Sequence, residues 1–357
     1  MDPYRLQHRQ ARRAGGRLNL LRVVHMTGSA VSDFLEELSR VYAEDCLTAT
    51  ADPSRYEFSI AHVTPDGRWR FPDDLSREGI AAAPSMPLAD AVARLVAINA
   101  HVMVPQMFCI PGMTRYRALF DMLRIPYVGN TPDVMSLAAH KARAKAVVAA
   151  AGVNVPRGEV LRAGETPSLA LPVVVKPVDS DNSLGVAFVR EQGEQSAALR
   201  GAFEHADEVL VETFIPLGRE IRAGCIEQNG EVFCLPFEEY AVDADDAPIR
   251  THGDKIGWGS GGVLQLMAKK QSRAWIVDPG DPITGAVRAA ALQCHAALGA
   301  RHYSLFDFRI DPSGVPWFLE ASPYCSFARA SVISVMAAAA GIPIEQLFAD
   351  MLNEALR

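Results

Sequence analysis

A lysine at the end of an apolar run is the first feature of the sequence that could take part in chemistry. Residues 173–177 read VVVKP, and the polar segment VDSDNSLG of residues 178–185 follows directly. The Lys176 ammonium is a point charge, and the amides and hydroxyls of a loop of small residues can donate hydrogen bonds to phosphate oxygens. The segment is not a Walker loop, because G-x-x-x-x-G-K-[ST] is absent and residues 186–189 predict a strand rather than a helix. An anion site and an exposed turn with a strand-end lysine both stay open.

Two acidic residues among apolar neighbours form the second feature. Asp307 and Glu320 lie in the runs 304–310 and 316–320, which we predict to form a hairpin around the turn at 311–314. Buried carboxylates are costly unless they are paired or bound to a cation. Two carboxylates that converge beside a polyphosphate suit Mg²⁺, which prefers hard oxygen ligands and often shares them with phosphate. The alternative is a pair of structural carboxylates that backbone amides satisfy.

The edge of another strand offers groups that a nucleobase can pair with. The predicted strand 209–212, VLVE, ends at Glu212, and Glu220 follows it. A strand edge presents backbone donors and acceptors to adenine, and an acidic side chain can hold ribose hydroxyls. An ordinary edge strand is the plainer explanation of these residues.

Lysines on a helix and in a glycine-rich loop complete the set. We predict a helix over 138–151, on which Lys141 and Lys145 are four residues apart and share a face. Lys255 lies in the glycine-rich stretch 251–262, a composition suited to a mobile lid with a lysine that reaches phosphate. The alternatives are a solvated helix face and a plain loop.

The elements that position these residues are predicted from hydrophobic periodicity. Before the motifs, strands are expected at 20–25, 56–63 and 101–105, and helices at 33–42 and 88–98. This alternation predicts a parallel α/β domain, and the segment GNTP at 129–132 marks its end. After the strand at 209–212 we predict a hairpin of 220–226 with 231–236. Further helices are expected over 283–298, 331–340 and 344–356, the last two closing the chain.

Composition sets the class of protein. The 357 residues suffice for about two or three domains. Thirty-five Lys and Arg against 42 Asp and Glu give a net charge of −7 with no basic block, so nucleic acid and anionic membranes are not expected as partners. The six cysteines form no C-x-x-C pair, which indicates reduced thiols in a cytoplasm. No signal peptide or membrane span is expected, and residues 1–18 are predicted to be a flexible tail.

The order of these features resembles the ATP-grasp superfamily, and the spacing is most similar to the D-alanine–D-alanine ligases. The similarity runs from about residue 20 to the end and is strongest over 126–226 and 300–352. It implies a mixed α/β (α+β) ATP-grasp fold in which the central and C-terminal domains enclose ATP. The implied domains are an N-terminal Rossmann-like domain (19–129), a central domain (130–212) and a C-terminal domain (213–357) with the metal and substrate site.

The resemblance also implies roles for individual residues. Contacts to ATP are implied for Lys141, Lys176, Asn182, Ser183, Gly185, Glu212, Phe214, Ile215 and Glu220. Ligands of Mg²⁺ or Mn²⁺ fall to Asp307, Glu320 and Ser322. Catalytic roles fall to Lys176, Lys255, Arg309 and Ser331, with Ser331 holding an amino-acid carboxylate.

Two positions depart from the pattern of the peptide ligases. Ser322 stands where the third metal ligand is usually Asn, and Leu305 stands where an arginine usually stabilises a tetrahedral oxyanion. Removing an oxyanion donor generally costs about a hundredfold or more in rate. Either Arg309 or Arg222 substitutes for that arginine, or the electrophile is different.

Several stretches are more specifically similar to the D-Ala–D-Ala ligase-like enzymes of mycosporine-like amino acid biosynthesis. They are residues 47–56, 105–114, 139–145, 180–185 and 324–327. This likeness implies that the amine of serine, threonine or a relative is joined to a cyclohexenone, mycosporine-glycine, through a phosphorylated ring oxygen, with release of ADP and phosphate. The alternatives are a dipeptide ligase acting through an acyl phosphate, an inactive nucleotide-binding regulator and a structural protein. Homodimers are common among the similar ligases, but the sequence itself does not give the oligomeric state.

Overall fold

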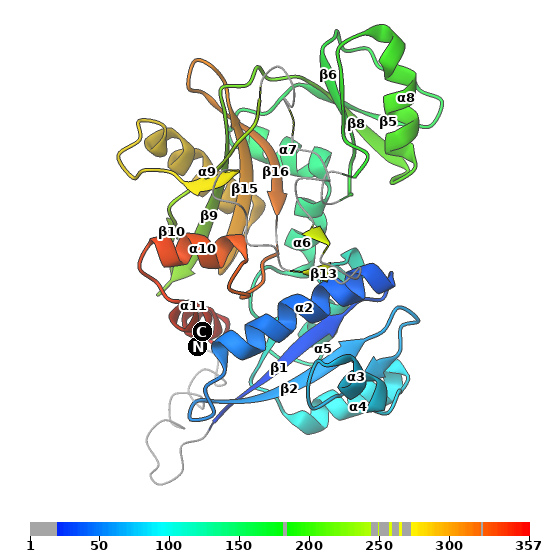
Figure 1. Cartoon of the computed structure of the whole chain (residues 1–357), viewed down its shortest axis with the longest axis vertical. Helices are drawn as coiled ribbons and strands as arrows, with labels where there is room; N and C mark the ends of the chain where they lie inside the picture. Colours follow the sequence, from blue (N-terminus) through cyan, green and yellow to red (C-terminus); the bar gives the residue numbers. More distant parts are fainter. Residues whose placement is uncertain are drawn as a thin grey trace.

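The computed structural model describes residues 20–180, 184–243, 249, 273–322 and 324–357, together with the backbone of 257–258 and 264–265. Its strands form one largely parallel sheet and then two antiparallel sheets, in that order along the chain, plus a two-stranded ribbon (Figure 1). The predicted tail 1–18, Asn182, Ser183 and Lys255 lie outside the described residues.

The N-terminal part is the predicted parallel α/β unit. Its sheet has the order β3-β2-β1-β4, and β1 pairs in parallel with both β2 and β4. The strands are β1 (Leu21–Gly28), β2 (Tyr56–Val63), β3 (Trp69–Arg70) and β4 (Val102–Pro105). The helices are α2 (Asp33–Thr50), α3 (Arg77–Ala82), α4 (Leu88–Ile98) and α5 (Arg117–Met122), the last preceded by a π-helical turn (Gly112–Tyr116).

A small antiparallel sheet follows, with the order β5-β8-β6-β7 and its own hydrophobic core. Its strands are β5 (Gly158–Arg162), β6 (Val173–Pro177), β7 (Ala187–Val189) and β8 (Glu208–Thr213), and α8 (Gln192–Phe203) covers one face (Figure 1). The prediction that a strand follows the loop after Lys176 is confirmed by β7. A phosphate-binding loop of the Walker type would have required a helix there.

The third sheet has the order β14-β11-β9-β15-β16, with β10 paired to β9. Its strands are β9 (Arg219–Gln228), β10 (Glu231–Cys234), β11 (Glu238–Tyr240), β14 (Ala274–Ile276), β15 (Tyr303–Ile310) and β16 (Pro316–Ser322). Both predicted hairpins, β9–β10 and β15–β16, are confirmed as antiparallel pairs. The separate ribbon consists of β12 (Gly257–Trp258) and β13 (Leu264–Gln265).

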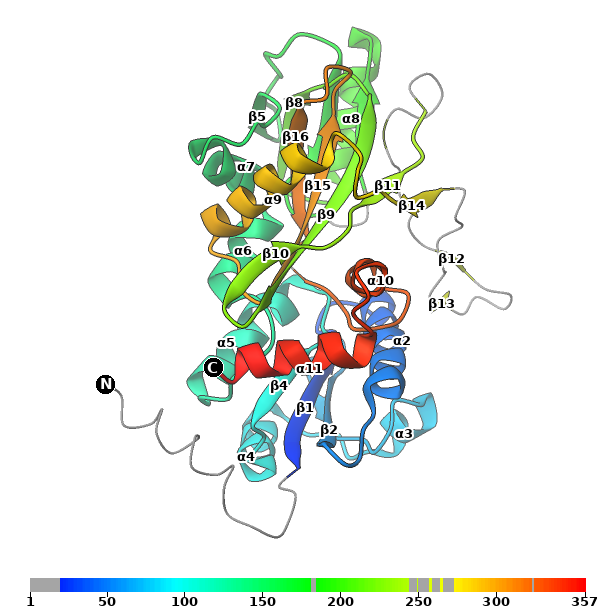
Figure 2. The same cartoon turned by 90° about the vertical axis from the view of Figure 1, so that its left-hand side faces the viewer.

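The two faces of this third sheet differ in chemistry. Ile221, Ala223, Phe306 and Phe308 face α9 (Thr284–Leu298) and α7 (Lys141–Ala150) in a continuous apolar core (Figure 2). On the other face, α10 (Val332–Ala339) and α11 (Ile344–Ala355) cover only one end of the sheet. The rest of that face carries charged side chains, and these form part of the site described below.

The predicted helix 138–151 is wrong at its start, because two helices meet there. α6 (Pro132–Ala139) ends at His140, which also caps α7 by accepting a hydrogen bond from the backbone N–H of Arg143 at 3.4 Å. Thr131 caps α6 and Pro132 takes its first position, where a missing N–H costs nothing. The break turns the first residue of α7, Lys141, toward the loop after β6.

No single helix among the described residues is long and apolar enough to cross a membrane. The pair α10 and α11 passes that test only when taken together, with a bend of 109° between them. Both helices contribute to the hydrophobic core that joins the N-terminal sheet to the third sheet.

Candidate functional site

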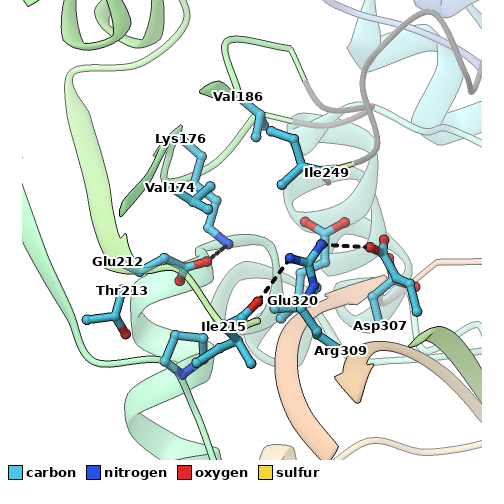
Figure 3. Close-up of a pocket in the computed structure, with 13 residues that line it drawn as sticks. Val174, Lys176, Val186, Glu212, Thr213, Ile215, Ile249, Asp307, Arg309 and Glu320 are labelled. Carbon is cyan, nitrogen blue, oxygen red and sulfur yellow. Dashed lines mark hydrogen bonds and ion pairs between the residues drawn. The ribbon is translucent and has the colours of Figure 1, made fainter. Parts of the chain in front are cut away.

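A pocket of about 640 Å³, which is partly open to solvent, lies between the small antiparallel sheet and the charged face of the third sheet (Figure 3). Lys176 and Glu212 line it from β6 and β8. Asp307 and Glu320 line it from β15 and β16. Four residues that the sequence singled out for separate reasons therefore face one space.

Glu212 lies between two lysines on one wall. Its carboxylate is 2.5 Å from Lys176 Nζ and 3.1 Å from Lys145 Nζ, and all three side chains are buried. Lys145 also donates to the carbonyl oxygen of Phe318 at 3.0 Å. The solvated-face interpretation of Lys141 and Lys145 is wrong. The sequence placed Lys145 on the same helix face as Lys141 but assigned it no role in the site. Its spacing of four from Lys141 was the available signal, but a solvated face has the same spacing.

The burial of this trio determines its charge. Desolvation lowers the pKa of Lys145 to about 8, although the Glu212 carboxylate acts in the opposite direction. For Glu212 itself, burial acts to raise the pKa, but the charges of Lys145 and Lys176 outweigh it and the pKa is lowered. Two ammonium groups against one carboxylate leave net positive charge on this wall at neutral pH, so the wall is suited to an anion.

Lys141 connects the phosphate-type loop to the acidic side of the pocket. Its Nζ donates to the carbonyl oxygen of Ser180, in the loop after β6, and lies 3.9 Å from Glu320 Oε2. Its backbone N–H donates to the Val178 carbonyl at 2.8 Å, which fixes the start of α7 against that loop. In the same loop, Gly185 has φ +68°, and a Cβ there would lie 2.8 Å from the His205 ring. Glycine is therefore required where the loop turns back.

A row of charges crosses the third sheet at the opposite wall. Arg222 on β9 lies directly opposite Asp307 on β15, and Asp307 lies directly opposite Glu320 on β16. The Arg222 Nε and Nη2 atoms donate to the two Asp307 carboxylate oxygens, each at 2.5 Å. This bidentate pair supplies the partner that a buried carboxylate requires.

Arg309 joins three other predicted residues into a second patch of wall. Its guanidinium donates to Glu220 Oε2 at 3.1 Å and to the Ile215 carbonyl at 3.2 Å, and it lies 5.2 Å from the centre of the Phe214 ring. Figure 3 marks the hydrogen bond from this guanidinium to the Ile215 carbonyl. The resemblance implies adenine contacts for Glu212, Phe214 and Ile215, and a ribose contact for Glu220.

The remaining predicted residues lie close to this pocket or follow it along the chain. Ser322 ends β16, two residues beyond Glu320, directly opposite Leu305. Leu305 packs into the core with Ile333 and Met336 of α10, so the place of the missing arginine is filled with apolar side chains. Ser331 is the N-cap residue of α10, and its hydroxyl donates to the Ser326 carbonyl. It is not among the described residues that line the pocket.

The carboxylates fit a divalent cation that shares its ligands. Within the described ranges, no group of three or more His, Cys, Asp or Glu side chains forms a complete metal cage. Asp307 and Glu320 supply hard oxygens from adjacent strands, beside a wall suited to anions. Mg²⁺ commonly takes only one or two carboxylates and completes its octahedron with phosphate oxygens and water. The donor set therefore fits Mg²⁺ held jointly by protein and polyphosphate.

Comparison with known sequences supports the same conclusion. A family model described as the D-ala D-ala ligase C-terminus matches residues 154–353. A D-alanine–D-alanine ligase of Nitrosospira multiformis is 30% identical over 295 residues, which cover 79% of this chain and 88% of that protein. A D-alanine–D-alanine ligase of Citrifermentans bemidjiense is 30% identical over 243 residues, which cover 67% of this chain and 73% of that protein.

Solved structures share the fold. The VanG D-Ala:D-Ser ligase from Enterococcus faecalis has a TM-score of 0.75 at 21% identity, covering 94% of this chain and 100% of that one. The D-alanine–D-alanine ligase from Bacillus anthracis complexed with ATP has a TM-score of 0.70 at 19% identity, covering 94% and 98%. These likenesses confirm the predicted mixed α/β ATP-grasp fold. The chain belongs to the D-alanine–D-alanine ligase family and is an ATP-dependent C–N ligase of the ATP-grasp type.

Proposed function

We propose that this chain uses ATP to phosphorylate an oxygen of one small substrate. It then joins the carbon that bears this oxygen to the amino group of an amino acid. The γ-phosphorus–oxygen bond to ADP breaks as a bond to the substrate oxygen forms. The amine nitrogen then displaces phosphate and loses its proton. The observation that carries the proposal is the pocket that Lys176 and Glu212 line on one side and Asp307 and Glu320 on the other.

In this proposal the base and ribose of the nucleotide occupy one region of the pocket, and its phosphates occupy another. Phe214, Ile215 and Glu220 hold adenine and ribose, and Arg309 fixes that wall through Glu220 and the Ile215 carbonyl. The nucleotide phosphates contact Lys141 and Lys176, and the resemblance assigns phosphate contacts also to Asn182, Ser183, Gly185 and Lys255. Ser331 orients the carboxylate of the amino acid.

Asp307 and Glu320, with Ser322, are the proposed ligands of Mg²⁺. When bound, the metal neutralises charge on the β- and γ-phosphates during transfer. The pocket walls contribute position and fixed charge, which account for most of the catalysis in phosphoryl transfer.

The relatives favour two amino acids as substrates. Two relatives that are 30% identical to this chain are D-alanine–D-alanine ligases, so a dipeptide ligase acting through an acyl phosphate is the first candidate. In that reaction an amine attacks a phosphorylated carboxylate and a tetrahedral oxyanion develops.

One observation favours a second candidate, the imine-forming ligase of mycosporine-like amino acid biosynthesis. Leu305 is buried against Ile333 and Met336, so no arginine stands at the position that usually meets the tetrahedral oxyanion. A phosphorylated ring ketone loses its phosphate without an acyl oxyanion of that kind. The second candidate therefore does not require the missing donor.

ADP release with Mg-ATP distinguishes the candidates. A panel of amino acids is tested with and without mycosporine-glycine, while absorbance is followed. ADP released from amino acids alone supports the dipeptide ligase. ADP released only when both are present, with a shift of the chromophore to longer wavelength, supports the imine-forming ligase. No ADP under any condition contradicts the proposal.

Substitutions in the pocket test the assignment of roles. Lys176→Ala and Glu320→Ala are expected to abolish ADP release while circular dichroism stays unchanged. Arg200→Ala, which removes an exposed charge on α8, serves as the control and retains activity. Normal turnover in either pocket variant contradicts the assignment.

A further inference from the structure

Arg222 lies within a row of charged residues that crosses four strands of the third sheet. The pairing sets it directly opposite Glu238 on β11 and Asp307 on β15, and Asp307 lies opposite Glu320 on β16. Directly opposed residues on neighbouring strands lie on the same face. Arg222 is the one cation of this row. A permanent positive charge thus adjoins the carboxylates proposed to hold the metal.

The partner of this charge is Asp307. Both Asp307 oxygens accept from Arg222, and the nearest aromatic contact is the Tyr240 ring, whose centre lies 5.8 Å from the guanidinium carbon. The Arg222 side chain is only 13% exposed. A guanidinium keeps its proton in proteins, so this charge needs an anion in every state of the site.

A divalent cation and Arg222 use the same carboxylate. When Asp307 binds a metal, its oxygens accept the two hydrogen bonds from Arg222 less strongly. The buried Arg222 charge is then no longer fully compensated, which is strongly unfavourable. Arg309 differs, because it also donates to Glu220 and to the Ile215 carbonyl. Arg222 is therefore the guanidinium that a bound metal frees for another anion.

We propose that Arg222 is a catalytic residue that exchanges Asp307 for the oxygens of the transferred phosphoryl group. This inference rests on the proposed function, and it holds for either substrate class because the phosphoryl group is common to both. It also gives the site a cation near the carboxylates although position 305 is leucine. Arg222 on β9 thus supplies, beside Asp307, the positive charge that Leu305 does not provide on β15.

Binding of Mn²⁺ to the nucleotide-free protein, followed by the paramagnetic resonance of free Mn²⁺, tests the exchange without turnover. Arg222→Met removes the competing cation, so Mn²⁺ affinity is expected to rise on the order of tenfold. Arg222→Lys, which keeps the charge but cannot form the bidentate pair, is expected to fall between wild type and Arg222→Met. Unchanged or weaker Mn²⁺ binding in Arg222→Met overturns the proposal.

Turnover supplies the second arm. The kcat for ADP release is expected to fall about a hundredfold in Arg222→Met, with little change in the KM for ATP. The control is Arg219→Met on the same strand, whose guanidinium pairs with Glu239 and Asp281 and should leave both kcat and Mn²⁺ affinity unchanged. If wild type releases no ADP, the proposed function fails, but Mn²⁺ binding still tests whether Arg222 competes with the metal for Asp307. If wild type turns over and Arg222→Met matches it, the role of Arg222 alone fails.

Discussion

The wall formed by Lys145, Lys176 and Glu212 couples a binding charge to folding stability. Burial lowers the pKa of Lys145 from 10.5 to about 8, whereas an unfolded lysine titrates near its ordinary value. Between these two pH values the unfolded chain holds a proton that the folded chain has released. The free energy of unfolding therefore gains a contribution that rises with pH across this window, by up to about 1 kcal/mol per pH unit.

Substituting Lys145 tests that contribution. We expect Lys145→Met to remove the rise, so that its stability relative to wild type falls progressively from pH 8 to about pH 10. Urea unfolding at three pH values measures the difference. Arg143→Met, on the exposed face of the same helix, should parallel wild type throughout. A constant difference between Lys145→Met and wild type would show that Lys145 does not titrate in this range.

Single residues show how far the sequence could predict the site. Asp307, Glu320 and Lys176 were singled out from their own neighbours, because a strand-end lysine and acids in apolar strands have local signatures. The role of Lys141 came from the family resemblance. The burial of Lys145 has no such signature, since its partner Glu212 lies on a different element. The pairing of Arg222 with Asp307 was also beyond the sequence, because alternation assigns a residue to a face but does not say which strand lies beside it.

At the scale of elements, the hairpins were predictable and their assembly was not. Each hairpin has a local turn signal, as at Asn229-Gly230 in the link between β9 and β10. The pairing of β9 with β15 joins two hairpins that are distant in the chain, and no local pattern specifies it. The short strands β11 and β14 and the helix α8 were not predicted.

A junction between elements aligns the N-terminal domain with the third sheet, and Gly129 is central to it. Its N–H donates to His302 Nδ1 at 2.9 Å, and its carbonyl accepts from Arg301 Nε at 2.7 Å. Gly129 has φ +88°, and a Cβ there would collide with the Tyr303 hydroxyl. The segment leads directly into α6 and α7, so it positions the lysines of the pocket.

Gly129→Ala is expected to destabilise the protein by about 3 kcal/mol, through left-handed strain and the collision together. Gly164→Ala is the matched control, since Gly164 has φ +93° with nothing within 4 Å of the added Cβ. It should carry only the strain, about 1 kcal/mol. Urea midpoints of both variants give the comparison. Equal losses would mean that Tyr303 moves aside and that the junction is not tightly packed.

At the scale of the whole molecule, the hydrophobic cores define which parts open together. One core joins the N-terminal sheet to α10, α11 and the third sheet, with Phe348 fully buried at its centre. The Phe348 ring packs against His25, Tyr56, Phe58 and Phe327. The small sheet β5–β8 has a separate core formed only from its own strands and α8 (Figure 1).

This division predicts that the small sheet, which carries Lys176 and Glu212, opens independently of the rest. Leu161→Ala in its core should cost about 2–5 kcal/mol and speed amide exchange in β5, β6 and β8, while β1 and β4 stay protected. Phe348→Ala, at about 3–5 kcal/mol, should instead speed exchange in β1, β4 and the third sheet together, because they share one core. Hydrogen exchange read by mass spectrometry distinguishes the two patterns. If Leu161→Ala exposes β1 and β4 as much as β6, the chain is one cooperative unit, and the small sheet cannot open alone to admit the proposed nucleotide.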